Sequence, residues 1–347
     1  MSGALRAFVW SRHSDTEPTF TFRGGGGRRG RRVRALRPLL ALVALAAIAL
    51  AGCGGSGTAH GGHGGHGGHD AHGEIEVAAT TNFITSTVRA IGGDRVDVQG
   101  LMGPGVDPHL YKPSAGDVRT LREADVIFYG GLELEGRMGD LFDRLRDRAV
   151  ALSEAVPASR LLTVPGKGVH DPHVWLDPAQ WKLAARRATD ELKRIDPDGA
   201  DGYERRLRAF TAEVDRADAH CRRVLGQVPP RSRVLVTSHD AFHYFARAYG
   251  FDVAAIQGVS TAAEASTADI RRVADVIVRR GVKAVFVESS LPRQTIEAVI
   301  AAAGRHGARV RLGGELYGDS AGEEGTPAGT YPGMLRHNCD TIAEGLR

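Results

Sequence analysis

The sequence predicts an α/β protein of two Rossmann-like lobes with parallel sheets, bridged by one long rigid α-helix. From Glu74 onward, short apolar runs typical of buried strands alternate with amphipathic segments typical of helices. This alternation is the pattern of parallel sheets covered by helices. It occurs in two series, separated by a strongly charged helical segment, Pro197–Leu225. The apolar residues of that segment form one stripe, as expected for a helix that lies across two domains.

The first series begins with an apolar run, Ile75–Ala79, that has the composition of a buried strand. The amphipathic segment after it ends at Gly92-Gly93, and the next apolar run leads into a loop that contains His109. The remaining elements alternate in the same way. The expected strands are Ile75–Ala79, Val96–Leu101 and Val126–Tyr129, and the expected helices are Asn82–Ile91, Ala115–Glu123, Arg137–Arg146 and Pro178–Ile195.

The bridging helix ends at Val228-Pro229-Pro230, because proline cannot continue a helix. We therefore expect the first lobe over residues 74–196, the bridging helix over 197–228 and the second lobe over 229–347. The stripe consists of Tyr203, Leu207, Phe210, Val214, Ala217 and Val224; the later strands are Val234–Thr237, Val253–Ile256, Ala284–Glu288 and Arg309–Leu312, and the later helices are Ala241–Tyr249, Ile270–Arg279, Gln294–Ala303 and Tyr331–Leu346.

The N-terminus is typical of an exported protein. Six arginines lie just ahead of a thirteen-residue apolar run, Leu39–Ala51, which is too short to span a bilayer but suits a signal peptide. The run ends in Leu50-Ala51-Gly52-Cys53, which resembles the lipobox of bacterial lipoproteins. We predict a lipoprotein signal peptide over residues 1–52 and lipidation of Cys53, so that the protein is extracytoplasmic and anchored to the outer face of the cell membrane. The alternative is an ordinary cleavage site beside an incidental cysteine.

The positive net charge of the chain comes from this leader. Residues 1–52 carry a net charge of +7, and the rest of the chain carries 36 basic and 39 acidic residues, a net charge of −3. A slightly acidic mature protein gives no reason to expect a nucleic-acid partner. The 295 residues that remain after the leader are enough for two α/β domains.

A histidine-rich, glycine-rich segment follows Cys53. Because it has no apolar residues to bury, we expect residues 53–73 to be a disordered tether. Imidazoles on a flexible chain can chelate a metal loosely, so we interpret the segment as an auxiliary metal-capturing tail; the alternative is a passive tether. Its histidines, five of the 14 in the chain, are His60, His63, His66, His69 and His72.

Cys221 and Cys339 are the cysteines that remain besides Cys53. Export permits a disulfide between them. Two separate buried thiols fit the sequence equally well, so the pairing stays open at this point.

Two Asp-Pro-His tripeptides, Asp107–His109 and Asp171–His173, are the most informative local feature. Proline fixes its own φ and biases the preceding residue away from helix, so the backbone aims the histidine that follows. His239 and Asp319 lie in loops of the second series, and ligands gather at the carboxyl ends of parallel strands. Three imidazoles and one carboxylate form a complete tetrahedral ligand set for a metal such as zinc. A closed set favours holding a metal over using it in catalysis.

Each of these residues also has a purely structural interpretation. Either tripeptide histidine could be a turn residue bonded to backbone, and His239 could fill space where Ser238 or Asp240 caps a helix. Asp319 lies in Gly-Asp-Ser, which is common in loops. Glu288 is expected near the same face, where it either orients a ligand histidine or is an ordinary loop carboxylate.

Two other histidines resemble ligands superficially. His239 and His243 are four residues apart, as in the His-Glu-x-x-His helix of zinc proteases. Here Asp240 replaces the glutamate and the segment begins at the end of a strand, which argues against a protease. His170 lies close to the second tripeptide, and we expect it to be solvated.

Four longer segments surround the candidate ligands: Gly105-Val106-Asp107-Pro108-His109-Leu110-Tyr111-Lys112-Pro113, Asp171-Pro172-His173-Val174-Trp175-Leu176-Asp177-Pro178, Ser238-His239-Asp240-Ala241-Phe242-His243-Tyr244-Phe245, and Gly313-Gly314-Glu315-Leu316-Tyr317-Gly318-Asp319. Together they resemble the metal-binding solute-binding lipoproteins of zinc and manganese ABC transporters (cluster A-I, TroA-like). The resemblance covers most of residues 74–347.

The resemblance implies that His109, His173, His239 and Asp319 bind the metal in the cleft between the lobes. It implies a rigid bridging helix, so that capture involves small lobe motions and loop ordering rather than wide closure. The loaded protein would then dock on a membrane permease powered by a separate ATPase. In zinc-specific relatives the histidine-rich stretch is often a loop inside the first lobe; here it precedes that lobe, so its help to the main site is open.

His239 favours zinc, because manganese-selective relatives tend to have a carboxylate at that position and imidazole suits zinc better than manganese. We therefore expect a monomeric zinc receptor of an ABC importer without catalytic activity, with manganese or iron as the alternative cargo. Two alternative functions from other classes are a zinc metallohydrolase that uses the same cleft and a surface metal buffer based on the histidine tract. A hydrolase would need a coordination position open to water.

Overall fold

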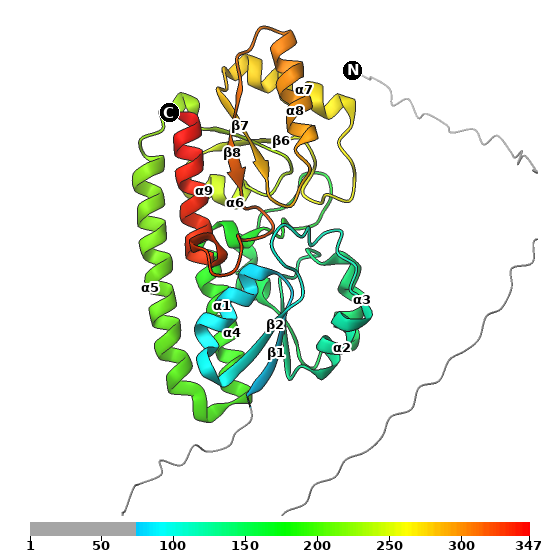
Figure 1. Ribbon diagram of the computed structural model, residues 1–347, viewed down its shortest axis with the longest axis vertical. Coiled ribbons are helices and arrows are strands. Elements are labelled where there is room, and N and C mark those ends of the chain that lie inside the picture. The colour runs from blue at the N-terminus through cyan, green and yellow to red at the C-terminus, as the bar shows by residue number, and fades with distance from the viewer. Residues whose placement is uncertain (1–73) are drawn as a thin grey trace, which may run out of the picture. The chain divides into compact units, whose positions relative to one another are not determined.

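The computed structural model describes residues 74–347 (Figure 1). The predicted signal peptide, Cys53 and the histidine tether, with His60, His63, His66, His69 and His72, lie outside the described residues. Within residues 74–347, no helix combines the length and the apolar character that crossing a bilayer requires. As predicted, the described part is an α/β structure of two lobes with parallel sheets and one long helix.

The N-terminal lobe contains a four-stranded parallel sheet in the order β2-β1-β3-β4. Parallel neighbours require crossover connections, and helical segments supply them here. The strands are β1 (Ile75–Ala79), β2 (Val96–Gly100), β3 (Val126–Tyr129) and β4 (Ala149–Ala151), and the helices are α1 (Asn82–Gly92), α2 (Ala115–Glu123), α3 (Gly139–Arg144) and α4 (Pro178–Ile195).

The C-terminal lobe repeats this strand order. β5 pairs with β6 and β7 pairs with β8, all in parallel, and β5 lies beside β7. The two pairs form separate two-stranded sheets, and the contact between β5 and β7 gives the spatial order β6-β5-β7-β8, in which the first strand again lies between the second and the third. The strands are β5 (Val234–Thr237), β6 (Asp252–Ala255), β7 (Ala284–Glu288) and β8 (Arg311–Leu316), and the helices are α6 (His243–Tyr249), α7 (Thr267–Arg280), α8 (Gln294–Arg305) and α9 (Tyr331–Leu346).

Both faces of the central strands β1, β3 and β7 are buried. In β7, Ala284 and Phe286 belong to a large central core, whereas Val285 and Val287 belong to a separate core in the C-terminal lobe. Successive side chains of a strand point to opposite faces, so a strand covered on both faces reads as a continuous apolar run. The central core contains residues from both lobes and from α4, α5 and α9. It is therefore the packing that holds the two lobes together.

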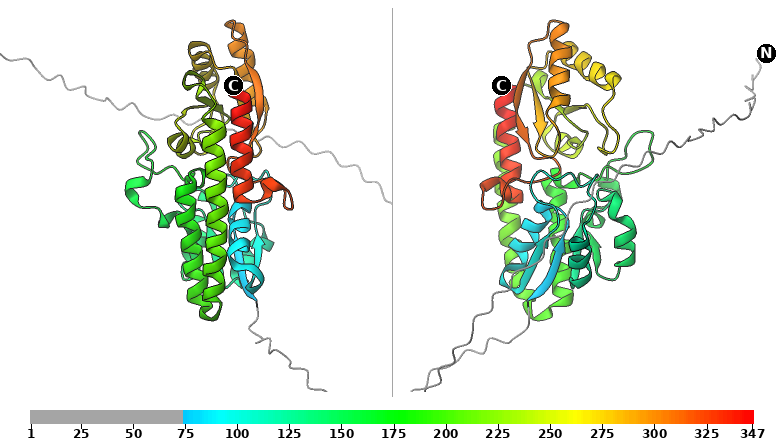
Figure 2. Two further views of the ribbon diagram at one scale, coloured as in Figure 1. Left: turned by 90° about the vertical axis from the view of Figure 1, so that its left-hand side faces the viewer. Right: turned by 45° about the vertical axis from the view of Figure 1, so that its right-hand side comes forward.

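The long helix α5 (Ala200–Leu225) runs alongside both lobes (Figures 1 and 2). It packs on α1 and α4 of the N-terminal lobe and on α9 of the C-terminal lobe. From Tyr203 to Val224 its buried residues are spaced alternately by four and three, which places them on one side of the helix. They are Tyr203, Leu207, Phe210, Val214, Ala217, Cys221, Val224 and Leu225, which include every residue of the predicted stripe.

Side-chain contacts near the start of α5 and a disulfide near its end join the helix to neighbouring elements. Just before its start, Arg95 donates to both carboxylate oxygens of Asp196 at 2.6 and 2.7 Å, and the hydroxyl of Tyr203 donates to the same carboxylate. The guanidinium of Arg95 thereby lowers the pKa of Asp196 to about 2. Near the other end, a disulfide between Cys221 and Cys339 joins α5 to α9. The pairing that the sequence leaves open is therefore made.

Several elements differ from the sequence-based expectations. The strand expected over Arg309–Leu312 covers Arg311–Leu316 instead. The sequence does not predict β4, because a three-residue run at the edge of the sheet carries almost no periodicity. The helix expected over Arg137–Arg146 is a 3-10 turn, Gly136–Met138, followed by the short α3, where two glycines weaken the helix. The helix expected from Ala241 begins only at His243, and no side chain caps it, so neither Ser238 nor Asp240 has that role.

We predict that the disulfide contributes to stability. The double variant Cys221→Ala/Cys339→Ala should unfold with a free energy lower by about 2–5 kcal/mol, because the bond restricts the unfolded chain across 118 residues. Chemical denaturation of the metal-free protein measures this difference. A reductant should bring the parent protein to the stability of the double variant and leave the variant itself unaffected. Equal stability of parent and variant would contradict the prediction.

Candidate metal centre

Four loops bring His109, His173, His239 and Asp319 together. His109 follows β2, His173 lies between β4 and α4, His239 follows β5, and Asp319 follows β8. Each side chain thus lies beyond the carboxyl end of a parallel strand, where α/β proteins bind ligands. Two residues come from each lobe, so the cluster lies between the lobes.

Each Asp-Pro-His tripeptide forms the same turn. The backbone N–H of His109 donates to Oδ1 of Asp107 at 2.9 Å, and that of His173 donates to Oδ1 of Asp171 at 3.0 Å. The intervening proline has no N–H, so the aspartate bonds the residue two positions on, as in an Asx turn. The backbone of each histidine is therefore fixed by its own tripeptide.

The three imidazole Nε2 atoms and the carboxylate of Asp319 face one another. Nε2 of His173 lies 3.4 Å from Nε2 of His109 and 3.3 Å from Nε2 of His239. The oxygens of Asp319 lie 3.1, 3.3 and 3.7 Å from Nε2 of His239, His173 and His109. All four ligand atoms lie within 4.8 Å of one another. Donors around one tetrahedral zinc are about 3.3 Å apart, given bonds of about 2.0 Å, so the spacing suits a single ion.

Carboxylate oxygens lie close to the Nδ1 atoms of two of the three rings. Oδ1 of Asp171 lies 2.7 Å from Nδ1 of His173. Oε2 of Glu288, at the end of β7, lies 2.7 Å from Nδ1 of His239, and its Oε1 accepts a hydrogen bond from the backbone N–H of His239 at 2.8 Å. A carboxylate at Nδ1 turns Nε2 toward the centre and makes it a better donor to a metal. Of the two interpretations of Glu288, the contact agrees with the orienting one.

The cluster is removed from water. His173 and His239 are 0% exposed, Asp319 is 1% exposed and His109 is 6% exposed. Neither oxygen of Asp319 receives a hydrogen bond of acceptable geometry from the described residues. A buried carboxylate without such partners is costly unless a cation neutralises it. The donor set, its spacing and the unpaired carboxylate therefore fit a divalent metal.

The protonation of the cluster follows from these contacts. Burial disfavours the charged form of every imidazole, and at His109 it dominates and lowers the pKa to about 3. Burial acts on His173 and His239 too, but the carboxylates of Asp171 and Asp319 raise the pKa of His173 to about 9. Asp319 and Glu288 likewise raise the pKa of His239 well above its usual value. Burial would raise the pKa of Asp319, but the imidazoles outweigh it and hold that pKa well below normal. In the absence of a metal, protons on His173 and His239 therefore supply the positive charge beside Asp319.

The loop of Asp319 is held by close packing that the sequence does not reveal. The indole Nε1 of Trp175 donates to the carbonyl of Gly318 at 2.9 Å, and the hydroxyl of Tyr331 donates to the carbonyl of Trp175 at 2.7 Å. A Cβ on Gly318 would clash with Oε2 of Glu288, so a larger residue there would displace the carboxylate that contacts His239. Trp175 and Gly318 lie in the segments that carry the family resemblance, but their contacts require the fold.

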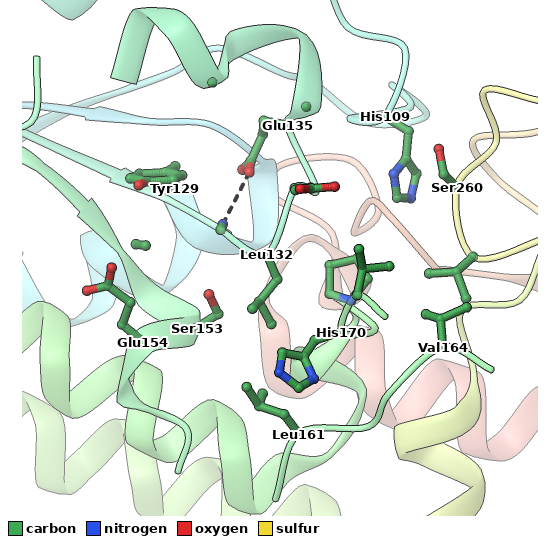
Figure 3. Close-up of a pocket in the computed structure, with 18 of the residues that line it drawn as sticks. His109, Tyr129, Leu132, Glu135, Ser153, Glu154, Leu161, Val164, His170 and Ser260 are labelled. Carbon is green, nitrogen blue, oxygen red and sulfur yellow. Dashed lines mark hydrogen bonds between the residues drawn. The ribbon is translucent and has the colours of Figure 1, made fainter. Parts of the chain in front are cut away.

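His170 and His243 do not join the cluster. His243 begins α6, and its Nε2 lies 2.9 Å from Oδ1 of Asp240, so the segment does not form the helix of a zinc protease. His170 is exposed and lines a cavity of about 1030 Å³. Figure 3 shows His109 on the wall of the same cavity. Of the four clustered residues, only His109 lines it.

The geometry of the site can be compared with known families. Residues 77–345 match the family described as zinc-uptake complex component A, periplasmic (ZnuA). This chain belongs to that family. The resemblance recognised in the sequence is thereby confirmed.

The names of individual relatives mention different metals. The zinc-binding protein TroA of Treponema pallidum is 44% identical over 276 residues, which are 79% of this chain and 89% of the relative. The manganese-binding lipoprotein MntA of Bacillus subtilis is 40% identical over 276 residues, which are 79% of this chain and 90% of the relative. The solved structure of the periplasmic zinc-binding protein TroA matches with a TM-score of 0.77 and 44% identity, over 79% of this chain and 99% of that chain. Membership therefore does not by itself identify the metal.

We predict that zinc binding at pH 7 releases protons. His173, with a pKa of about 9, and His239, with a raised pKa, are protonated in the metal-free site at that pH and must lose their protons to bind a metal. Zinc affinity should therefore rise as the pH is raised from 7 toward 9, where His173 loses its proton. Calorimetric titration in buffers of different ionisation enthalpy measures the number of protons released.

A matched control for this measurement is His243→Gln. The pKa of His243 is also raised, by Asp240, but its ring lies outside the cluster, so proton release should not change. Binding heats that are equal in all buffers would contradict the protonated metal-free state.

Proposed function

We propose that this protein is the zinc receptor of an ABC importer. Zinc binds between the two lobes to Nε2 of His109, His173 and His239 and to the carboxylate of Asp319. The receptor then delivers the metal to a membrane permease that a separate ATPase powers. Glu288 and Asp171 orient two of the ligand histidines through their Nδ1 atoms.

The observation that carries this proposal is the closed set of four buried donors. Their atoms are spaced as around one tetrahedral ion, and the carboxylate among them has no hydrogen-bond partner of acceptable geometry within residues 74–347. The same closure argues against a metallohydrolase, because a catalytic zinc keeps a position open for water. Binding without catalysis is also consistent with the relatives, which are named as metal-binding proteins.

Zinc is supported over manganese by the chemistry of the donors. Three imidazoles and one carboxylate suit zinc, whereas manganese prefers oxygen ligands. The relatives named for zinc and for manganese are almost equally similar, at 44% and 40% identity. The support for zinc therefore comes from His239, and manganese or iron is the alternative cargo that the experiment below separates.

We further propose that the receptor works outside the cytoplasm as a monomer. After removal of residues 1–52, a lipid on Cys53 would anchor it, and residues 53–73 would link the anchor to the folded part. The arginine-rich leader, the lipobox and the lipoprotein named among the relatives support this arrangement. The boundaries at 74–196, 197–228 and 229–347 remain our proposed division of the folded part.

Metal competition tests the proposal. The mature chain, residues 53–347 with Cys53→Ser to avoid lipidation, should bind one zinc ion tightly after it has been stripped of metal, and manganese should not displace that ion. Calorimetry measures both affinities. Deleting residues 60–72 should remove weak extra binding only. Tight manganese binding would overturn the zinc assignment, and loss of the tight site on deletion would favour the surface metal buffer.

Substitution of the ligands tests the site. His239→Ala and Asp319→Asn should each lower zinc affinity by more than about 100-fold, because loss of a direct ligand costs more than the 10–100-fold typical of residues that orient ligands. His243→Ala removes an imidazole four residues from His239 that contacts none of the four donors, and it should bind like the parent protein. Full affinity in His239→Ala would exclude that residue as a ligand.

A further inference from the structure

The aspartates of the two Asp-Pro-His tripeptides differ in the second hydrogen bond that each side chain makes. In the second tripeptide, one oxygen of Asp171 meets both the backbone N–H and Nδ1 of His173. In the first, Oδ1 of Asp107 accepts from the backbone N–H of His109, and Oδ2 accepts from the hydroxyl of Thr261 at 2.6 Å. Thr261 lies between β6 and α7, in the C-terminal lobe. The first aspartate therefore links the two lobes and does not hold the ring of its own histidine.

His109 is accordingly the least restrained imidazole of the cluster. Its polar contacts to His173 and Asp319 both involve Nε2, the atom that faces the proposed metal. In the part of the chain that the structure describes, His109 is the one clustered histidine without a hydrogen bond or ion pair from Nδ1 to a carboxylate. Its place in the cluster thus depends on where its loop lies.

The His109 loop reaches the C-terminal lobe through two hydroxyl groups. Besides the bond from Thr261 to Asp107, the backbone N–H of Gly105 donates to Oγ of Ser320 at 3.0 Å. Both contacts are partly buried.

The side of the cluster around His173 is held differently. There the lobes are joined by hydrogen bonds of the fully buried side chains of Trp175, Tyr244 and Tyr331. The hydroxyl contacts can break by a shift of one loop, whereas the aromatic hydrogen bonds can break only if large, fully buried rings leave the core. The His109 side is therefore the side that can open.

The cavity of about 1030 Å³ lies on this side. His109 lines it from the N-terminal lobe, and Ser260 and Ala262, the neighbours of Thr261, line it from the C-terminal lobe (Figure 3). If the loop of His109 separated from Thr261, His109 would move next to this cavity. A hydrated ion could then reach the remaining three ligands.

We propose that the hydrogen bond between Thr261 and Asp107 is the gate of the metal site. While it is intact, the loop holds His109 against the other three ligands. When it breaks, His109 leaves the cluster and the metal enters or departs past it. Thr261 is thus a positioning residue that sets the dissociation rate of the metal without changing the ligand set. This inference rests on the proposed function.

The test compares Thr261→Val, which removes the hydroxyl, with Thr261→Ser, which keeps it. In the mature chain loaded with zinc, transfer to excess chromophoric chelator in a stopped-flow instrument gives the dissociation rate. Thr261→Val should dissociate about 10–100 times faster, the loss expected for a hydrogen bond to a charged group. Thr261→Ser should keep the parent rate. Thr189→Val is the matched control, because Thr189 is equally buried but bonds within α4.

A second measurement separates a gate from general damage to the site. With cobalt in place of zinc, the visible spectrum reports the ligand set, and all variants should show the spectrum of the parent protein. A parent-like dissociation rate in Thr261→Val, equal acceleration in Thr261→Ser, or an altered cobalt spectrum would each overturn the gate. If Thr261→Val does not fold, Thr261→Ala replaces it in the same comparison. A parent protein without a tight zinc site would refute the proposed function itself.

Discussion

The buried carboxylate of Asp319 governs the arrangement of the side chains in the metal centre. It lies among three imidazole Nε2 atoms, and both of its oxygens lack a hydrogen bond of acceptable geometry from the described residues. Such a group is tolerated only if positive charge surrounds it. In the metal-free protein, protons on His173 and His239 supply that charge, as the raised pKa values show. A divalent cation would supply it with better geometry, so the same arrangement that is costly when empty favours capture.

The fold meets this constraint by repeating one sheet arrangement on both sides of the cluster. In each lobe the first strand lies between the second and the third, and the loops beyond the carboxyl ends of the strands carry the donors. The central core, the long helix α5 and the disulfide to α9 join the lobes behind the site. Because this connection is extensive, large hinge motion is disfavoured. In the gate that we propose, exchange of the metal depends on local movement at the His109 side of the cluster.

Identical tripeptides have different roles because their neighbours differ. Asp171 faces the ring of the histidine that it precedes, and it raises the pKa of that ring to about 9. Asp107 faces Thr261 of the other lobe, so the ring of His109 lacks a carboxylate at Nδ1 and its pKa falls to about 3. One histidine is therefore held firmly and the other is held through its loop. This difference in contacts is the basis of the gate that we propose at His109.

The sequence alone predicted the α/β class, the long helix with its apolar stripe and the four residues that the structure brings together, because periodicity, proline turns and ligand chemistry are local properties of the chain. It did not determine β4, whose three residues become a strand only by pairing with β3, nor the start of α6 at His243. It left the pairing of Cys221 with Cys339 open, and it could not show that Asp107 reaches Thr261 across 154 residues. These features are contacts between distant segments, and only packing of the whole chain decides which groups meet.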